Sequence, residues 1–451
     1  MRGERRVRFR PCTVRSGAVR GLLVRDVRGG VGAGPGPGGQ NAVMRSVQDH
    51  LAGVLAAVGP VAPLDVALAD AVGCILAADV LVTTAVPPLR VAARDGYAVQ
   101  ARDTVDTAFA GRALPVAHDV LAGAHAPLRL VPGQAVRIAS GAPLPLGADA
   151  VVPVEETDHG AVRVTLQREA VVGQHVREVG SDARAGEVAL EAGIRLGARQ
   201  LALAATLGRG RLRVHPRPRV VIVSIGDELI EPGSAGRDGA VYEANGHALE
   251  TAVRDAGAAA VRVGIVSDEH AILREALEDQ LVRADLVVTT GGLSEYAHDT
   301  VKDVLAPLGT VRFDHVAMAP GRRQGFGTVG ALGRDSAIPI FALQGHPFAA
   351  QVSFEVFVRP ALRAMAGHVD LFRPSVTADA QVTWSSPPGL RQFVPAVVVG
   401  SPAEGYEVSP VGDPGDMSVT ALSRANALAV VGEQDVTVHR GQRVHCLVLE
   451  G

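Results

Sequence analysis

Two acidic residues stand directly after an apolar run in the middle of the chain. The run Val220–Ile225 contains valine, isoleucine and one serine, and Gly226, Asp227 and Glu228 follow it. A short β-branched run before a glycine predicts a buried strand that ends in a turn. Open α/β sheets bind ligands at the carboxyl ends of their strands. The two carboxylates are therefore candidates for catalysis, although taken alone they are also compatible with the solvated acids of an ordinary turn.

A second strand end repeats this design. The apolar run Leu286–Thr290 is followed by Gly291 and Gly292, and Ser294 adds a hydroxyl group. Backbone N–H groups in such a turn can bind an anion. A lone glycine pair is more often a tight turn than a phosphate loop. Two such strand ends in one chain nevertheless predict a binding site at the edge of a sheet.

Apolar runs and helical patterns alternate between residues 218 and 367. The predicted strands are 220–225, 260–266, 285–290 and 338–343, and the predicted helices are 245–256, 269–282, 299–307 and 348–366. Such alternation is typical of a parallel sheet with helices on both faces. We therefore expect a doubly wound α/β domain over 218–367.

The rest of the chain is predicted to be rich in β-structure. Valine-rich runs broken by Pro and Gly predict a small β-rich domain at 91–173. Short strands within 368–451 predict a small C-terminal β-barrel domain. The segments 44–90 and 174–217 flank the β-rich domain, and we expect them to form an elongated domain that begins with a helix capped by Ser46.

Residues 1–43 differ from the rest of the chain. They are rich in Arg and then in Gly and Pro, which predicts a disordered basic tail. The tail could be an interaction arm or a targeting segment, but it lacks the continuous apolar region of a secretory signal. We favour the interpretation that translation starts at Met44.

Composition argues against several classes of function. The 451 residues carry a net charge of −3, with 47% hydrophobic and 20% charged residues. This balance gives no basic field for binding nucleic acid, and no apolar run reaches the length needed to span a membrane. The three cysteines are far apart and form neither a disulfide framework nor a metal pair. We expect a multidomain cytoplasmic protein.

Six segments occur in a distinctive order and spacing. They are Val86–Val99, Arg137–Val152, Gly180–Asp182 with Ala185-Gly186, Gly226–Leu229, Gly291–Ser294 and Gly345–Pro347. Together they resemble the molybdopterin molybdenumtransferases of molybdenum cofactor synthesis, a family that includes the gephyrin E domain. The resemblance covers roughly Met44 to the C-terminus, and six ordered matches make a chance similarity improbable.

The resemblance implies an enzyme that hydrolyses adenylylated molybdopterin, releases AMP and inserts molybdate into the dithiolene, assisted by Mg²⁺. Such a metal needs oxygen ligands, and Mg²⁺ prefers one or two carboxylates plus substrate phosphates. The resemblance also implies an α/β domain of the molybdopterin-binding type and contact with the molybdopterin adenylyltransferase. It further implies a homodimer whose active cleft lies between the α/β domain of one subunit and the β-rich domain of the other.

The same resemblance assigns roles to individual residues. The catalytic candidates are Asp95, Ser140, Asp182, Glu228, Asp268 and Asp299. The candidates for binding the pterin substrate are Gly291, Gly292, Ser294, Arg322, Gly345 and Pro347. The candidate metal ligands are Asp227, Glu228 and Asp299.

The basic residues depart from the family pattern. Where the family has lysines that help to bind the phosphate and molybdate, this chain has His315 and Ala319, with Arg322 and Arg323 nearby. Arginine can bind an oxyanion, but its geometry differs from that of lysine. Glu295-Tyr296 also replaces smaller residues after the glycine turn. The alternative hypothesis is therefore a catalytically degenerate, gephyrin-like paralogue that binds the pterin or serves as a scaffold.

Overall fold

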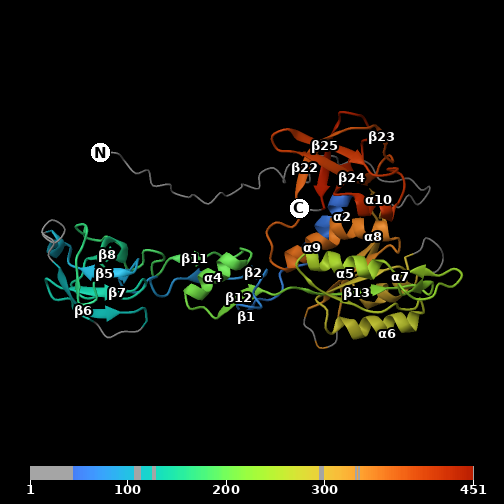
Figure 1. Cartoon of the computed structure of the whole chain (residues 1–451). Helices are drawn as coiled ribbons and strands as arrows, with labels where there is room; N and C mark the ends of the chain where they lie inside the picture. Colours follow the sequence, from blue (N-terminus) through green and yellow to red (C-terminus); the bar gives the residue numbers. More distant parts are fainter. Residues whose placement is uncertain are drawn as a thin grey trace, which may run out of the picture. The chain divides into compact units, whose positions relative to one another are not determined.

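A computed structural model describes residues 44–105, 113–123, 128–293, 299–330, 333 and 336–449. The chain divides into two compact units. Figure 1 shows the whole chain, coloured from the N-terminus to the C-terminus. One unit contains Pro218–Met365, the C-terminal region from Asp370 and the segment that ends at Gly59. The other contains Pro60–Arg217 and Ala366–Val369. No helix within the described ranges is long and apolar enough to cross a membrane.

The first unit is built on a six-stranded sheet. Its strands follow the order β16 (Ala259–Arg262), β13 (Arg219–Ser224), β17 (Leu286–Thr290), β21 (Ile338–Leu343), β20 (Arg323–Val329) and β18 (Arg312–His315). The first four strands run parallel, and β20 and β18 are antiparallel to their neighbours. The parallel part confirms the predicted sheet, whereas the two antiparallel strands were not predicted.

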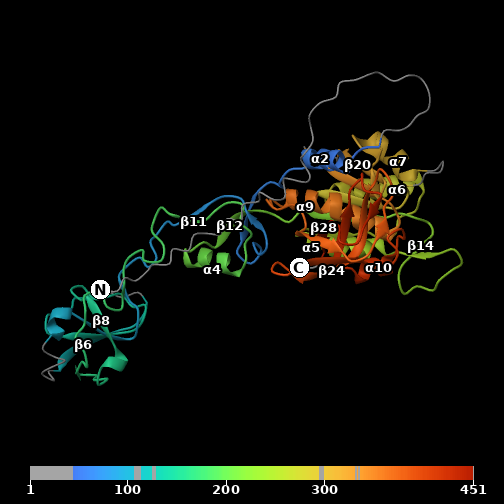
Figure 2. The same ribbon diagram turned by 90° about the horizontal axis from the view of Figure 1, so that it is seen from above.

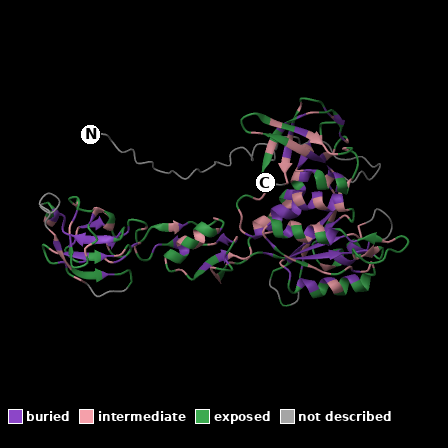
Figure 3. Cartoon of the chain, viewed as in Figure 1, coloured by how far each residue is buried: buried purple, intermediate pink, exposed green. Residues whose placement is uncertain are grey.

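Helices cover both faces of this sheet, as predicted for a doubly wound domain. They are α5 (Asn245–Asp255), α6 (His270–Leu281), α7 (Thr300–Leu305), α8 (Pro347–Ser353) and α9 (Arg359–Met365). Apolar residues of α6 and α7 pack on alternate residues of β13, such as Val221 and Val223. Figure 1 shows α5 and α8 on the opposite side of β13 from α6. The strands between these layers are buried, whereas the outer side of α6 is exposed (Figure 3).

The predicted helix 348–366 is one helical run of three parts. A π-helical segment, η4 (Phe354–Val358), joins α8 to α9. Helix α2 (Val47–Ala57) packs against α9, η4 and β20, so it belongs to this unit, whereas the prediction placed it in one domain with residues 174–217. Ser46 caps α2 as expected, because its hydroxyl accepts a hydrogen bond from the Asp49 N–H at 3.0 Å.

The C-terminal region is a closed five-stranded barrel, which confirms the prediction. Its strands are β22 (Ser375–Ala380), β24 (Arg391–Ser401), β25 (Gly405–Pro410), β26 (Ala427–Val431) and β28 (Arg443–Val448). They pair in the ring β24-β25-β22-β28-β26, and β26 pairs with β24 to close it. Small side chains and Trp384 fill the interior. The short strand β19 (Met318–Ala319) adds to the edge of β24.

The described part of the second unit contains two sheets of three or more strands. A five-stranded sheet has the order β8 (Ala150–Pro153), β5 (Gly96–Val99), β7 (Ala135–Ile138), β6 (Leu114–Val120) and β9 (Arg163–Val164). A three-stranded sheet of β1 (Leu64–Ala67), β12 (Arg211–His215) and β2 (Ile75–Leu76) shares an apolar core with α4 (Ala198–Thr206). Figure 2 shows α4 beside β12. Two ribbons accompany these sheets: β10 (Val176–Arg177) with β4 (Val91–Ala92), and β11 (Val188–Leu190) with β3 (Val80–Leu81).

Candidate active site

Three carboxylates lie in the segments that follow β13 and β16. The turn after β13 exposes Asp227 and Glu228, and the backbone N–H of Asp227 lies 3.3 Å from a carboxylate oxygen of Asp268. The side chain of Glu228 folds over Gly226, because a Cβ added to that glycine would meet the Glu228 carboxylate. Arg237 fixes the turn by donating to the backbone oxygen of Asp227 at 2.6 Å. The structure therefore places the Asp268 carboxylate against the backbone of the turn that carries Asp227 and Glu228.

The glycine turn after β17 lies against the same strand end. Gly291 and Gly292 have φ angles of 89° and 64°, which side chains rarely adopt. A Cβ on Gly291 would collide with the backbone oxygen of Ile225, and one on Gly292 would collide with Val301 of α7. Ser294, with Glu295 and Tyr296, lies outside the described residues. Glycine is thus required here because the backbone of Ile225 and the side chain of Val301 approach so closely.

The turn after β21 completes what we call the carboxyl edge, which comprises residues 225–228, 291–293 and 344–347. Gly345 lies beside Gly291, and Pro347 is the first residue of α8, where a missing N–H costs nothing. The side-chain amide of Asn245, at the start of α5, donates to the backbone oxygen of Gly345 at 2.7 Å. The buried side-chain oxygen of Asn245 has no hydrogen-bond partner among the described residues. Three consecutive strand ends therefore meet at one place.

The Asp299 carboxylate is occupied by an ion pair and is not exposed to a ligand. It accepts a hydrogen bond from Arg323 at 2.7 Å, and both side chains are largely buried, with 10% and 15% of their surface exposed. The Asp299 carboxylate also caps α7 through the Lys302 N–H at 3.4 Å. The neighbouring Arg322 is exposed. Arg323 stands opposite His315 in the pairing of β20 with β18.

Glu243 is not among the predicted site residues. Glu243 is buried, and one carboxylate oxygen accepts from the Ser224 hydroxyl at 2.9 Å and from the Gly246 N–H at 2.7 Å. The other oxygen lies 3.3 Å from Arg262. The sequence feature that could have identified Glu243 is its position just before a predicted helix, since acids stabilise the first turn of a helix.

The remaining predicted residues belong to the second unit. Asp95 and Ser140 are in direct contact, because the Ser140 N–H donates to the Asp95 carboxylate at 2.6 Å. The Ser140 hydroxyl donates to the backbone oxygen of Ala93 at 3.3 Å. Asp182 is exposed and lies 3.8 Å from Arg177. In this unit Asp95 therefore serves as the anchor of a turn.

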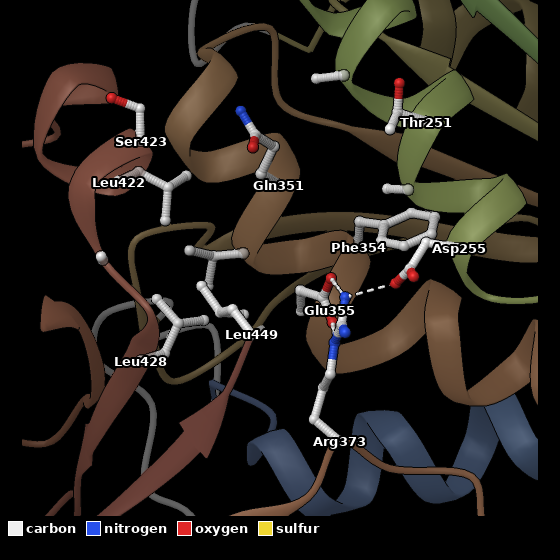
Figure 4. Close-up of a pocket in the computed structure, with 14 residues that line it drawn as sticks. Thr251, Asp255, Gln351, Phe354, Glu355, Arg373, Leu422, Ser423, Leu428 and Leu449 are labelled. Carbon is white, nitrogen blue, oxygen red and sulfur yellow. Dashed lines mark hydrogen bonds and ion pairs between the residues drawn. The ribbon is translucent and has the colours of Figure 1, made fainter. Parts of the chain in front are cut away.

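A separate pocket of about 540 Å³ lies in the first unit. Its walls come from α5, α8, η4, β26 and α10 (Val419–Arg424), and none of the predicted site residues lines it. Figure 4 shows Arg373 at one end, where its guanidinium group contacts Glu355 and Asp255. The opposite wall is apolar, with Leu422, Leu428 and Leu449. Because the charges at this pocket are already paired, the carboxyl edge remains the stronger candidate site.

The donor set at the carboxyl edge suits a hard cation. Within the described ranges no three His, Cys, Asp or Glu side chains gather closely enough to hold a metal ion by themselves. Carboxylate oxygens from Asp227 and Glu228 are nevertheless available, and Mg²⁺ completes its shell with water and substrate phosphates. Asp299 fits the predicted metal role less well, because Arg323 occupies its carboxylate.

Comparison with known proteins places the chain in a family. Family models match three regions: the MoeA N-terminal region (domain I and II) at residues 45–208, a probable molybdopterin binding domain at 221–364, and the MoeA C-terminal region (domain IV) at 377–449. The molybdopterin molybdenumtransferase 2 of Mycobacterium tuberculosis is 39% identical over 408 residues, which cover 89% of this chain and 98% of that protein. This chain belongs to the molybdopterin molybdenumtransferase family.

Other molybdopterin molybdenumtransferases and a solved structure agree with this assignment. The Bacillus subtilis molybdopterin molybdenumtransferase is 32% identical, over 85% of this chain and 89% of that protein. The crystal structure of a molybdopterin biosynthesis MoeA protein from Pyrococcus horikoshii superimposes with a TM-score of 0.75 at 27% identity, and covers 90% of this chain and all of that chain. The carboxyl edge of this family member lies within the matched molybdopterin binding domain, and Asp95, Ser140 and Asp182 lie within the matched N-terminal region.

Proposed function

We propose that the protein is a molybdopterin molybdenumtransferase that inserts molybdate into adenylylated molybdopterin and releases AMP. The observation that carries this proposal is the close approach of the glycine turn at Gly291 to the backbone of Ile225, directly before the turn that exposes Asp227 and Glu228. A phosphoanhydride substrate needs both an anion-binding backbone and oxygen ligands for a divalent cation. The curated relatives from Mycobacterium tuberculosis and Bacillus subtilis are named molybdopterin molybdenumtransferases, which supports the transferase role.

Each part of the carboxyl edge has a role in this proposal. Asp227 and Glu228 would hold Mg²⁺, which when bound neutralises charge on the phosphates that the reaction separates. Asp268 fixes the backbone of Asp227 and so orients the carboxylates of this turn. The glycines allow the backbone to approach the substrate phosphate closely. Gly345 and Pro347 form the adjoining wall, positioned by Asn245.

AMP release from adenylylated molybdopterin, measured with Mg²⁺ and molybdate, tests the proposal. We expect the wild type to release AMP and the double variant Asp227→Asn/Glu228→Gln to lose at least about a hundredfold in rate, since it lacks the ligands of the cation. Asp238→Asn is the matched control, because Asp238 is an exposed acid of the nearby 231–240 loop. Equal rates in all three proteins would refute the proposed role of this turn.

The alternative function is a paralogue that binds the pterin or acts as a scaffold without turnover. The Arg323–Asp299 ion pair and the absence of lysine at His315 and Ala319 favour it. The double variant His315→Lys/Ala319→Lys separates the two functions. A large gain of AMP release would identify a decayed site, whereas an active wild type that the variant does not improve would exclude this alternative.

The assembly and location of the protein are also proposals. We propose a homodimer in the cytoplasm that receives its substrate from the molybdopterin adenylyltransferase, as the family resemblance implies. Light scattering of the full chain tests the dimer, and a mass of one chain at micromolar concentration would refute it. Co-purification with the adenylyltransferase tests the second partner.

A further inference from the structure

Arg323 and Asp299 form a charged contact at the carboxyl edge. Arg323 opens β20, and Gly325 pairs with Ala342 of β21, so Arg323 lies level with the point where β21 ends at Leu343. The guanidinium group donates to the Asp299 carboxylate at 2.7 Å. The contact is largely buried, which weakens its screening by salt.

This ion pair lies in the same region as the other carboxylates. Val301, two residues after Asp299, packs against the Gly292 turn. Asp303, one helical turn after Asp299, lies 3.5 Å from His270, which begins α6 two residues after Asp268. A phosphate at the glycine turn would therefore approach Arg323 and Asp299 together.

A divalent cation and Arg323 compete for the same carboxylate. The Asp299 carboxylate binds a divalent cation poorly while the guanidinium group contacts it. The two positive charges would lie within a few ångströms of each other and repel. Guanidinium groups also bind phosphate oxygens through two parallel hydrogen bonds. A phosphate thus offers Arg323 an equivalent partner and leaves Asp299 free.

From this competition, and resting on the proposed function, we propose that Arg323 binds the substrate's phosphate and, by leaving Asp299, opens that carboxylate to a divalent cation. The oxyanion and the cation then bind cooperatively at the carboxyl edge. Linkage requires that each raises the affinity for the other by the same factor. Arg323, in addition to the exposed Arg322, is then an anion-binding residue of this chain.

Mn²⁺ binding to the full chain, followed by the electron paramagnetic resonance of the free ion, tests this coupling with AMP as the phosphate probe. We expect AMP to lower the Mn²⁺ dissociation constant of the wild type about tenfold or more, after correction for Mn²⁺ bound to AMP in solution. Arg323→Gln should bind Mn²⁺ tightly without AMP and show no effect of AMP. Asp299→Asn should bind Mn²⁺ weakly in both conditions, and Arg323→Lys should keep part of the coupling.

Arg312→Gln is the matched control, because Arg312 is an exposed arginine on the adjacent strand β18. It should retain the coupling of the wild type. Thermal unfolding of each variant shows whether it is folded. If Arg323→Gln does not fold, Arg323→Lys still tests the coupling. An unchanged Mn²⁺ affinity in the wild type with AMP would overturn the inference, even if AMP release from the full substrate were normal. Coupled binding without turnover would instead overturn the proposed function alone.

Discussion

Glu243 and Ser224 are joined by a buried hydrogen bond of 2.9 Å that connects the start of α5 to the end of β13. The same carboxylate oxygen accepts from the Gly246 N–H, and the other faces Arg262. A buried carboxylate is stable only when its oxygens are satisfied. Glu243 therefore fixes the helix that presents Asn245 to the carboxyl edge.

Replacing Glu243 by Asp shortens the side chain that joins α5 to β13. We expect Glu243→Asp to lower the free energy of unfolding by about 1–3 kcal/mol, because the shorter side chain cannot reach both Ser224 and Gly246. Urea unfolding measures the loss. In the Asp background, Ser224→Ala should cost less than it does in the wild type, and strictly additive costs would contradict the role given to this hydrogen bond.

The glycine turn gives a second prediction. Gly291→Ala should lower the free energy of unfolding by about 2–4 kcal/mol and reduce AMP release at least tenfold, since the new Cβ meets the backbone of Ile225. Gly239→Ala is the control, because Gly239 also has a positive φ, of 78°, but open space around it. The control should cost about 1 kcal/mol and retain activity. Equal losses in both variants would show that the close approach at Gly291 is unimportant.

The sequence predicted the parallel part of the fold well. Predicted strands 220–225, 285–290 and 338–343 differ from β13, β17 and β21 by at most one residue at either end, because fully buried β-branched runs leave few alternatives. Strand β20 escaped prediction. Its sequence Arg323–Val329 contains two glycines and begins with arginine, so its local pattern is weak and only pairing with β21 makes it a strand.

The candidate site was predictable where it depends on backbone and not where it depends on side-chain partners. Strand ends and glycines placed Asp227, Glu228, Gly291 and Gly292 at one edge. The partner of Asp299 was not predictable, because Arg323 is 24 positions away on an antiparallel strand. Spacing along the chain gives no sign of such a contact, and the resemblance directed attention to Arg322.

The charged end of the pocket in Figure 4 yields a stability prediction. Arg373 donates to both Glu355 oxygens at 2.9 and 3.0 Å, and both side chains are mostly buried. Glu355→Gln should lower the free energy of unfolding by about 3 kcal/mol, because it leaves a buried guanidinium charge without its main partner. Glu278→Gln, which breaks an exposed pair with Arg274, should cost under about 0.5 kcal/mol. Denaturant unfolding that shows no difference between the two variants would contradict this account.

His50 predicts how stability depends on pH. This histidine of α2 packs edge-on against Phe357 at 4.8 Å, and neither ring nitrogen has a hydrogen-bond partner among the described residues. Burial lowers the pKa of His50 from 6.5 to about 4; Arg45 adds to the effect, and Asp314 opposes it.

The unfolded chain therefore takes up a proton on His50 at a higher pH than the folded protein does. The contribution of the neutral imidazole to stability is complete above pH 6.5 and declines as the pH falls to about 4, by roughly 3 kcal/mol in total. His50→Leu should remove this part of the pH dependence and, because it buries no unsatisfied nitrogen, raise the free energy of unfolding at pH 7 by about 1 kcal/mol. Urea unfolding of both proteins between pH 4 and pH 7.5 provides the measurement. If the variant kept the wild-type slope across this range, another group would have to be the source of the acid sensitivity.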